Sequence, residues 1–247
     1  MLLRKGKKPT RRQRMIFWGI VLFFAAVGVW GVRWYDNNSR FIIAIREAKT
    51  ETVKEYLSAG RNPNVRVPLR IYGKFVWVTP LDAALTTNTP EIVMMLLEKG
   101  ANSNERNTEG MSLLMAAILD GDKSEIVSAL LAHGADPNGE ASDTMTPLLL
   151  ASGQGLSEDI RALLKAGADV NALGRKRDGR ADGFNALMYY IKFDTDEGKD
   201  VDIPRLLLDA GLDIQHKADN GESAFSMAER KFPGSPLATF LKERATQ

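Results

Sequence analysis

The sequence predicts an all-α protein, a helical solenoid of about five repeats plus a C-terminal cap, preceded by one N-terminal transmembrane helix. Three observations predict this class. A short apolar pattern that ends in Gly recurs along most of the chain, with intervals of 34 (Gly100 to Gly134) and 33 residues (Gly134 to Gly167). Each copy follows a Thr, Ser or Asn that opens an apolar segment, and residues 15–32 form an apolar run of 18 residues. A period near 33 residues is typical of stacked repeats.

The apolar run, MIFWGIVLFFAAVGVWGV, contains no charged side chain. At about 1.5 Å per residue it nearly spans a hydrocarbon layer of about 30 Å as a helix. Trp18 lies near one end, with Trp30, Trp34 and Tyr35 near the other, as in the aromatic belts of membrane helices. We therefore expect a membrane-spanning helix over residues 15–32.

Charge around this run predicts its orientation. Residues 1–14 are a basic tail without acids, whose Lys and Arg residues are Arg4, Lys5, Lys7, Lys8, Arg11, Arg12 and Arg14. Only three arginines (33, 40 and 46) follow the run closely, so the tail is expected in the cytoplasm and the body outside it, in the periplasm of a bacterium. The alternative is a cleaved signal peptide. An uncleaved signal anchor is favoured because the run exceeds the usual ~7–15 residues and lacks an A-x-A site.

The net charge of +2 conceals this segregation. Removing the seven basic residues of the tail from the 33 in the chain leaves 26 against 31 acidic residues, a charge of −5 for the rest. The sequence pI of about 8.7 therefore describes the tail, and we expect no nucleic-acid partner. The chain has no Cys, which excludes disulfides, thiolate nucleophiles and Cys-ligated zinc.

The recurring pieces read LLEKGANSN from Leu96, LLAHGADPN from Leu130 and LLKAGADVN from Leu163, with looser copies from Tyr56 and Leu206. Each glycine is expected to be a left-handed helix C-cap. These glycines are Gly60, Gly100, Gly134, Gly167 and Gly211. The expected helix-opening residues are Ser39, Thr79, Ser112, Thr146 and Asn185. In TPLD, Thr79 fits an N-cap, Pro80 the first helical position, and Asp82 the partner in a capping box.

These residues resemble the ankyrin repeat family, whose hallmark is approximately G-x-T-P-L-H-x-A-A followed by I-V-x-x-L-L-x-x-G-A-D-x-N. The resemblance covers residues 38–247 and is strongest from Thr79 to Asn171. It implies a stack of helix pairs that binds partners through its finger tips and inner helices, here including residues 106–109, 142–145 and 174–182. The family histidine is replaced by Asp82, Met115 and Leu149, and the last unit ends in a polar tail typical of a cap.

Two connections between repeats are long. The distance from a repeat's glycine to the residue that opens the next helix is 19 residues after Gly60 and 18 after Gly167, but 12 after the other three glycines. The first insertion, VRVPLRIYGKFVWV (residues 65–78), alternates apolar and basic residues and predicts a β-hairpin finger. Its candidate partner-binding residues are Arg66, Arg70, Tyr72, Lys74, Phe75 and Trp77. Two alternatives remain open: Val65, Val67, Phe75 and Trp77 cover the edge of the first repeat, or the finger meets anionic lipid.

The second insertion, LGRKRDGRADGF, places Arg175, Lys176 and Arg177 among glycines. These residues are candidates for contact with a partner, a phosphate or anionic lipid, and a solvated loop is the alternative.

The sequence predicts no enzyme, no cofactor and no metal. His133 is expected at a helix end and His216 in a solvated loop, and neither accompanies a serine elbow or H-E-x-x-H spacing. The run DTDEGKDVD alternates carboxylates, but the Gly and Glu positions of an EF-hand counted from Asp194 hold Lys199 and Arg205. An acidic solvated excursion is therefore expected there.

Together these features predict a membrane-anchored, non-catalytic module for protein–protein interaction, displayed outside the cytoplasm and binding an unidentified protein. The alternative is a membrane-surface element that binds anionic lipid through the 65–78 finger. A stress-protection or toxin-neutralising binder is a further alternative, suggested by the family resemblance alone. Nothing in the sequence predicts the oligomeric state.

Overall fold

The computed structural model describes residues 31, 35–71, 73–107, 109–139, 145–174 and 182–246. The basic tail of residues 1–14 and nearly all of the predicted membrane helix of residues 15–32 lie outside these ranges. Within the described ranges, no helix is both long and apolar enough to cross a membrane. The membrane anchor therefore stays a prediction.

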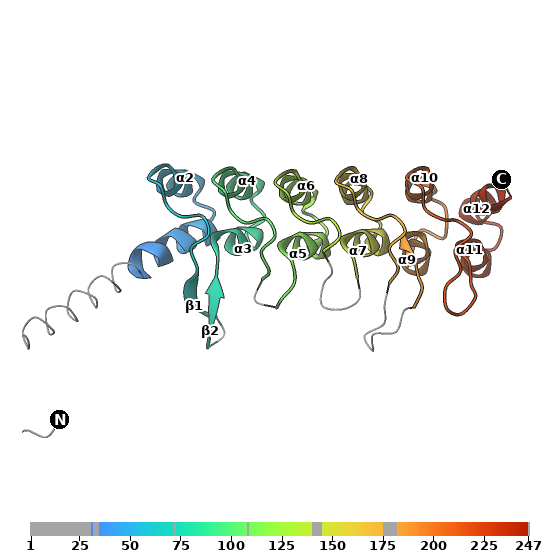
Figure 1. Ribbon diagram of the computed structural model, residues 1–247, viewed down its shortest axis with the longest axis horizontal. Coiled ribbons are helices and arrows are strands. Elements are labelled where there is room, and N and C mark those ends of the chain that lie inside the picture. Colours follow the sequence, from blue (N-terminus) through green and yellow to red (C-terminus); the bar gives the residue numbers. More distant parts are fainter. Residues whose placement is uncertain are drawn as a thin grey trace, which may run out of the picture.

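Within the described residues the chain forms six helix pairs stacked side by side in two rows (Figure 1). The first pair consists of a helix over residues 35–46 and α2 (Thr50–Ser58). The remaining pairs are α3 (Pro80–Leu85) with α4 (Pro90–Glu98), α5 (Leu113–Asp120) with α6 (Ser124–Ala132), α7 (Pro147–Gln154) with α8 (Ser157–Lys165), α9 (Ala186–Phe193) with α10 (Asp202–Asp209), and α11 (Ala224–Lys231) with α12 (Pro236–Ala245). The predicted solenoid of five repeats and a cap is confirmed.

Four of the five predicted helix-opening residues are N-caps. The side chains of Thr79, Ser112, Thr146 and Asn185 each accept a hydrogen bond from the backbone N–H three residues later, at 3.2, 3.2, 3.4 and 3.0 Å. Such caps satisfy donors that a helix leaves unpaired at its start.

The fifth prediction was wrong, because the first helix already includes residues 35–38 and Ser39 lies buried inside it. The capping box predicted for Thr79 and Asp82 forms only by half, through the hydrogen bond from the Asp82 N–H to the Thr79 hydroxyl. A complete box forms instead between Ser223 and Ser226 in the cap.

A Gly-x-Asp/Asn-x-Asn sequence follows four of the outer helices, α2, α4, α6 and α8, and ties each of them to the next repeat. The five predicted C-cap glycines all have positive φ, from 79° to 95°. The amide of Asn104 donates to the Gly134 carbonyl at 2.8 Å and accepts from the Asp136 N–H at 2.7 Å. Asn64, Asn138 and Asn171 make the same pair of bonds to the repeats that follow them.

The core is one continuous apolar layer between the two helix rows, extending from Phe41 to Leu241. Leucines and isoleucines of both rows, such as Ile92 of α4 and Ile118 of α5, are fully buried in it. One helix pair cannot bury its apolar face alone, so each pair depends on its neighbours for stability.

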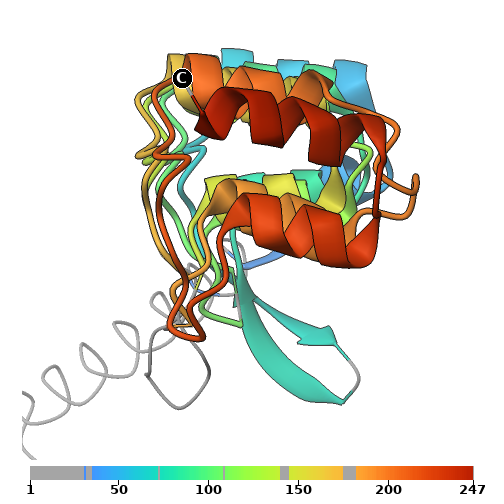
Figure 2. The same ribbon diagram turned by 90° about the vertical axis from the view of Figure 1, so that its right-hand side faces the viewer.

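The predicted finger is confirmed as an antiparallel hairpin of β1 (Val67–Ile71) and β2 (Lys74–Val78). It projects away from the inner helices, on the side where the other inter-repeat loops lie (Figures 1 and 2). This hairpin is the part of the described chain that departs most from an all-α fold.

Candidate interaction surfaces

The two faces of the hairpin differ in burial. On one face Val67 is opposite Val78, and both are buried, while the next pair, Leu69 and Val76, packs against the core. On the other face Arg70 is opposite Phe75 and Pro68 is opposite Trp77. Phe75 is 74% exposed and Trp77 is 62% exposed.

The predicted covering role of the finger is therefore half correct. Val65 and Val67 are buried and cover the edge of the first repeat, whereas Phe75 and Trp77 face solvent. Large aromatic side chains left in solvent on a regular hairpin are candidates for contact with another surface.

The other predicted finger residues have different environments. The guanidinium of Arg66 forms an ion pair at 3.0 Å with Glu105, a carboxylate that is 9% exposed. Arg66 thus ties the hairpin to the next repeat, and Arg70 is exposed beside Phe75. Tyr72 and the side chain of Lys74 lie outside the described structure.

A cleft of about 290 Å³ separates the hairpin from the next finger. Its lining is mixed in charge and includes Trp77, Asp82, Glu105 and Arg106. Burial, as the largest cause, and the nearby carboxylates of Glu105 and Glu109 together raise the pKa of Asp82 to about 6. Asp82 stands where the family pattern has a histidine, so a carboxylate takes a position next to the hairpin.

The basic residues of the second insertion, Arg175, Lys176 and Arg177, lie outside the described residues, so their predicted role is untested. The two ends of this insertion are held together, because the Gly174 N–H donates to the Phe184 carbonyl at 2.8 Å and the Asp182 N–H to the Gly174 carbonyl at 3.2 Å.

A row of residues at the C-terminal ends of the inner helices was missed from the sequence. Counting seven positions from each N-cap gives Leu119 on α5, Gly153 on α7 and Lys192 on α9, and Phe193 follows Lys192. Leu119 and Phe193 are each 52% exposed. We call these four residues the inner-helix row. A comparison of equivalent positions across repeats would have found it.

The aromatic end of this row is well packed. Phe193 stacks on Tyr189 with ring centroids 6.3 Å apart, and a Cβ added to Gly153 would lie 3.2 Å from the Phe193 ring. The Lys192 ammonium lies 5.1, 5.7 and 5.4 Å from the ring centroids of Phe184, Tyr189 and Phe193. These cation–π contacts place a positive charge at the edge of an apolar surface.

Beside Phe193 lies a second cleft, of about 200 Å³, rimmed by the acidic loop of residues 194–200. The loop is exposed at Glu197 and Lys199, as predicted for a solvated excursion, but it is also tied to the body, because the Leu237 N–H donates to the Gly198 carbonyl at 3.0 Å. The Asp194 carboxylate accepts hydrogen bonds from the N–H groups of Asp196 and Gly198, at 2.7 and 3.0 Å, and Asp200 accepts one from Asp202 at 2.8 Å. Within the described chain, no group of three or more His, Asp or Glu residues could hold a metal ion.

Both histidines have structural positions. His133 lies at the end of α6, directly before Gly134, as predicted, and its carbonyl oxygen accepts a hydrogen bond from Ser103 at 2.9 Å. The prediction of a solvated His216 was wrong, because its Nε2 lies 2.7 Å from the Gly183 carbonyl oxygen and joins two successive loops.

Comparison with known proteins agrees with this architecture. The family model for ankyrin repeats in three copies matches residues 41–141 and 81–174. The chain is similar to the crystal structure of an ankyrin repeat domain from Acinetobacter baumannii AYE, with a TM-score of 0.70 and 24% identity, covering 84% of this chain and 98% of that one. At that identity the likeness concerns the fold. No curated protein matches the chain. Since the family model spans more than half of its length, the chain belongs to the ankyrin repeat family.

Proposed function

We propose that this chain is a membrane-anchored, non-catalytic ankyrin repeat module that binds a protein partner outside the cytoplasm. Ankyrin repeats generally mediate protein–protein interaction. The observation that carries the proposal is the inner-helix row, where Leu119 and Phe193 remain half-exposed and Phe193 lines a cleft of about 200 Å³. Large apolar side chains next to a cleft are typical of the centre of a binding surface.

The anchor and the orientation are supported by the sequence. Residues 15–32 are an uncharged apolar run that nearly spans the hydrocarbon layer as a helix, and the basic tail of residues 1–14 favours a cytoplasmic N-terminus. Tethering raises the concentration of the solenoid near membrane partners. A partner that is a toxin or a stress-damaged protein would give the chain the protective role suggested by the family resemblance.

The partner site is tested by a photoreactive phenylalanine derivative placed at position 193 of the full chain in intact membranes. We expect it to crosslink one defined protein, and Leu119→Ala in the same chain should reduce the yield. Met94, which is 45% exposed on α4 of the outer row, provides the control position. Equal crosslinking at positions 94 and 193 would contradict a specific site on the inner-helix row. Reporter fusions after Asp36 and at the C-terminus test the orientation separately.

A further inference from the structure

One face of the hairpin packs on the core, and the other is open to solvent and, at Trp77, to the cleft beside the next finger. Val67 and Val78 attach the hairpin to the core, whereas Arg70, Phe75 and Trp77 lie on the opposite face. Phe75 and Trp77 are the two most exposed large apolar side chains of the described residues. Their exposure has no explanation within the fold, which points to a surface outside it.

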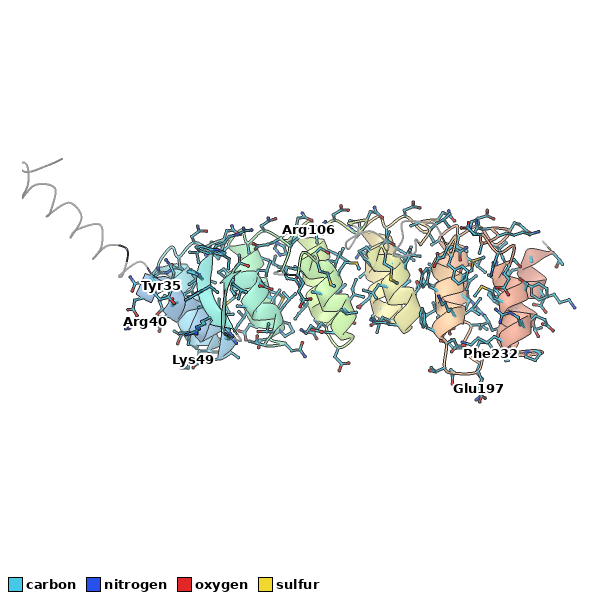
Figure 3. All side chains as sticks on the ribbon, turned by 90° about the horizontal axis from the view of Figure 1, so that it is seen from below. Tyr35, Arg40, Lys49, Arg106, Glu197 and Phe232 are labelled. Atoms are coloured by element: carbon cyan, nitrogen blue, oxygen red, sulfur yellow. The ribbon has the colours of Figure 1, made fainter. Side chains whose placement is uncertain are left out.

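The hairpin is close to the point where the chain would leave the membrane. The Tyr35 hydroxyl lies 3.5 Å from the Pro68 carbonyl oxygen of β1, and Tyr35 is at the hairpin end of the molecule in Figure 3. Tyr35 follows the last residue of the predicted span, Val32, by three positions. Three residues cover about 4.5 Å as a helix and at most about 11 Å when extended.

These lengths bring the hairpin to the bilayer surface. The headgroup region on each side of the hydrocarbon core is roughly 5–8 Å thick. The short tether from Val32 to Tyr35, the Tyr35 side chain and its 3.5 Å contact with Pro68 together keep β1, and Trp77 opposite Pro68, close to the membrane surface.

The chemistry of the exposed face fits this location. Trp is enriched at the membrane–water interface because its ring is apolar and its N–H is polar. Arg70 directly faces Phe75 across the hairpin, so a cation and an aromatic ring project together. A basic side chain near an anionic leaflet contributes favourably to binding, and an already tethered domain needs only a weak second contact.

We propose that the face formed by Arg70, Phe75 and Trp77 rests in the headgroup layer of an anionic membrane and fixes the orientation of the solenoid above it. This inference rests on the membrane anchor of the proposed function. The finger then serves as a second membrane contact, and the inner-helix row, on later repeats, is left for the protein partner.

The absence of Cys makes the test direct, because Phe75→Cys introduces the only thiol of the chain. The full chain is labelled there with an environment-sensitive dye and reconstituted into vesicles of phosphatidylcholine and phosphatidylglycerol that contain lipids with a spin-labelled headgroup. We expect quenching at position 75 to exceed that at a Met94→Cys control by roughly twofold or more, since quenching is confined to the headgroup layer. Adding Arg70→Ala and Trp77→Ala should lower the quenching at position 75.

The outcomes separate the two proposals. If the labelled chain does not float with the vesicles, both the anchor and the lipid contact are overturned. If it floats but position 75 is quenched no more than position 94, the anchor stands and the lipid contact fails. Shielding of position 75 from soluble quenchers in native membranes, but not in pure lipid vesicles, would assign this face to a protein instead.

Discussion

The hairpin of residues 67–78 and the acidic loop of residues 194–200 both add length to the repeat pattern, but they relate to the solenoid in opposite ways. The hairpin buries one face and leaves Phe75 and Trp77 in solvent. The acidic loop turns its Asp194 carboxylate onto backbone N–H groups and packs against α11 and α12. Figure 3 shows Glu197 of this loop beside Phe232, which follows α11. The loop contributes to stability, while the hairpin presents a surface.

The largest change in stability is expected from one of two glycine substitutions that compare the acidic loop with the hairpin. Gly198→Ala would force a side chain into a backbone with φ of 69° and place its Cβ 2.8 Å from the Ser235 hydroxyl and 3.1 Å from Phe232. We expect the free energy of unfolding to fall by about 3 kcal/mol. In the hairpin turn Gly73 has a φ of 81°, but a Cβ added there would have no described atom within 4 Å. For Gly73→Ala, backbone strain alone should therefore lower the free energy of unfolding by about 1 kcal/mol.

Chemical denaturation of the detergent-solubilised full chain, followed by circular dichroism, measures both glycine variants. Equal losses would mean that the acidic loop packs no more closely than the hairpin turn, which would remove the distinction between the two insertions.

An intermediate loss of stability is expected where Lys231 of α11 donates hydrogen bonds to the start of the acidic loop. The Lys231 ammonium donates to the carbonyls of Ile191, Lys192 and Asp194, at 2.8, 2.9 and 3.0 Å. Lys231→Met keeps most of the side-chain length but leaves these helix-end carbonyls without their donor, so we expect a loss of about 2 kcal/mol. The exposed Lys242, on α12, provides the control as Lys242→Met, with an expected change under about 0.5 kcal/mol. A similar small change for both variants would show that Lys231 does not stabilise the loop.

The features that the sequence predicted correctly are those that depend on neighbouring residues alone. Caps and C-cap glycines act within one turn of helix, so Thr79, Ser112 and Gly134 could be assigned from local pattern alone. The hairpin also followed from alternation around Tyr72-Gly73. Ser39 was misassigned because the preceding residues continue the helix, and no local signal separates a cap from a buried helical serine there.

The inner-helix row and the packing of the acidic loop depend on contacts between distant residues. Gly198 meets Phe232 and Ser235, and Lys192 meets Phe184, only after the repeats have stacked. The exposure of Phe75 and Trp77 likewise depends on which face of the hairpin turns toward the core. Alternation predicts two faces, but it does not say which face is covered when both carry large apolar residues.

The smallest change in stability is expected from carboxylates in the acidic loop and beside the hairpin. Those of Asp194 and Asp200 accept backbone N–H groups, whereas Asp82, next to the hairpin, is partly buried near Glu105 and Glu109. Its pKa is raised from 3.8 to about 6, because burial disfavours the charged form. The folded state therefore binds the proton more tightly than the unfolded state. The resulting stabilisation is complete below pH 3.8 and is lost as the pH rises through about 6.

Asp82→Asn removes this dependence and should raise the free energy of unfolding at pH 7 by about 1 kcal/mol, a value reduced from the full shift because solvent screens a partly exposed group. The gain should disappear near pH 4, where the wild-type carboxyl is protonated in the folded state. Asp200→Ala provides the opposite case, since it deletes the acceptor of the Asp202 N–H and should destabilise the chain at pH 7 by about 1 kcal/mol. Denaturation curves between pH 4 and 7 measure both. A stabilising Asp200→Ala would mean that the Asp200 carboxylate does not hold the Asp202 N–H. An Asp82→Asn gain that persists at pH 4 would mean that the gain does not come from the charge of a partly buried Asp82 carboxylate.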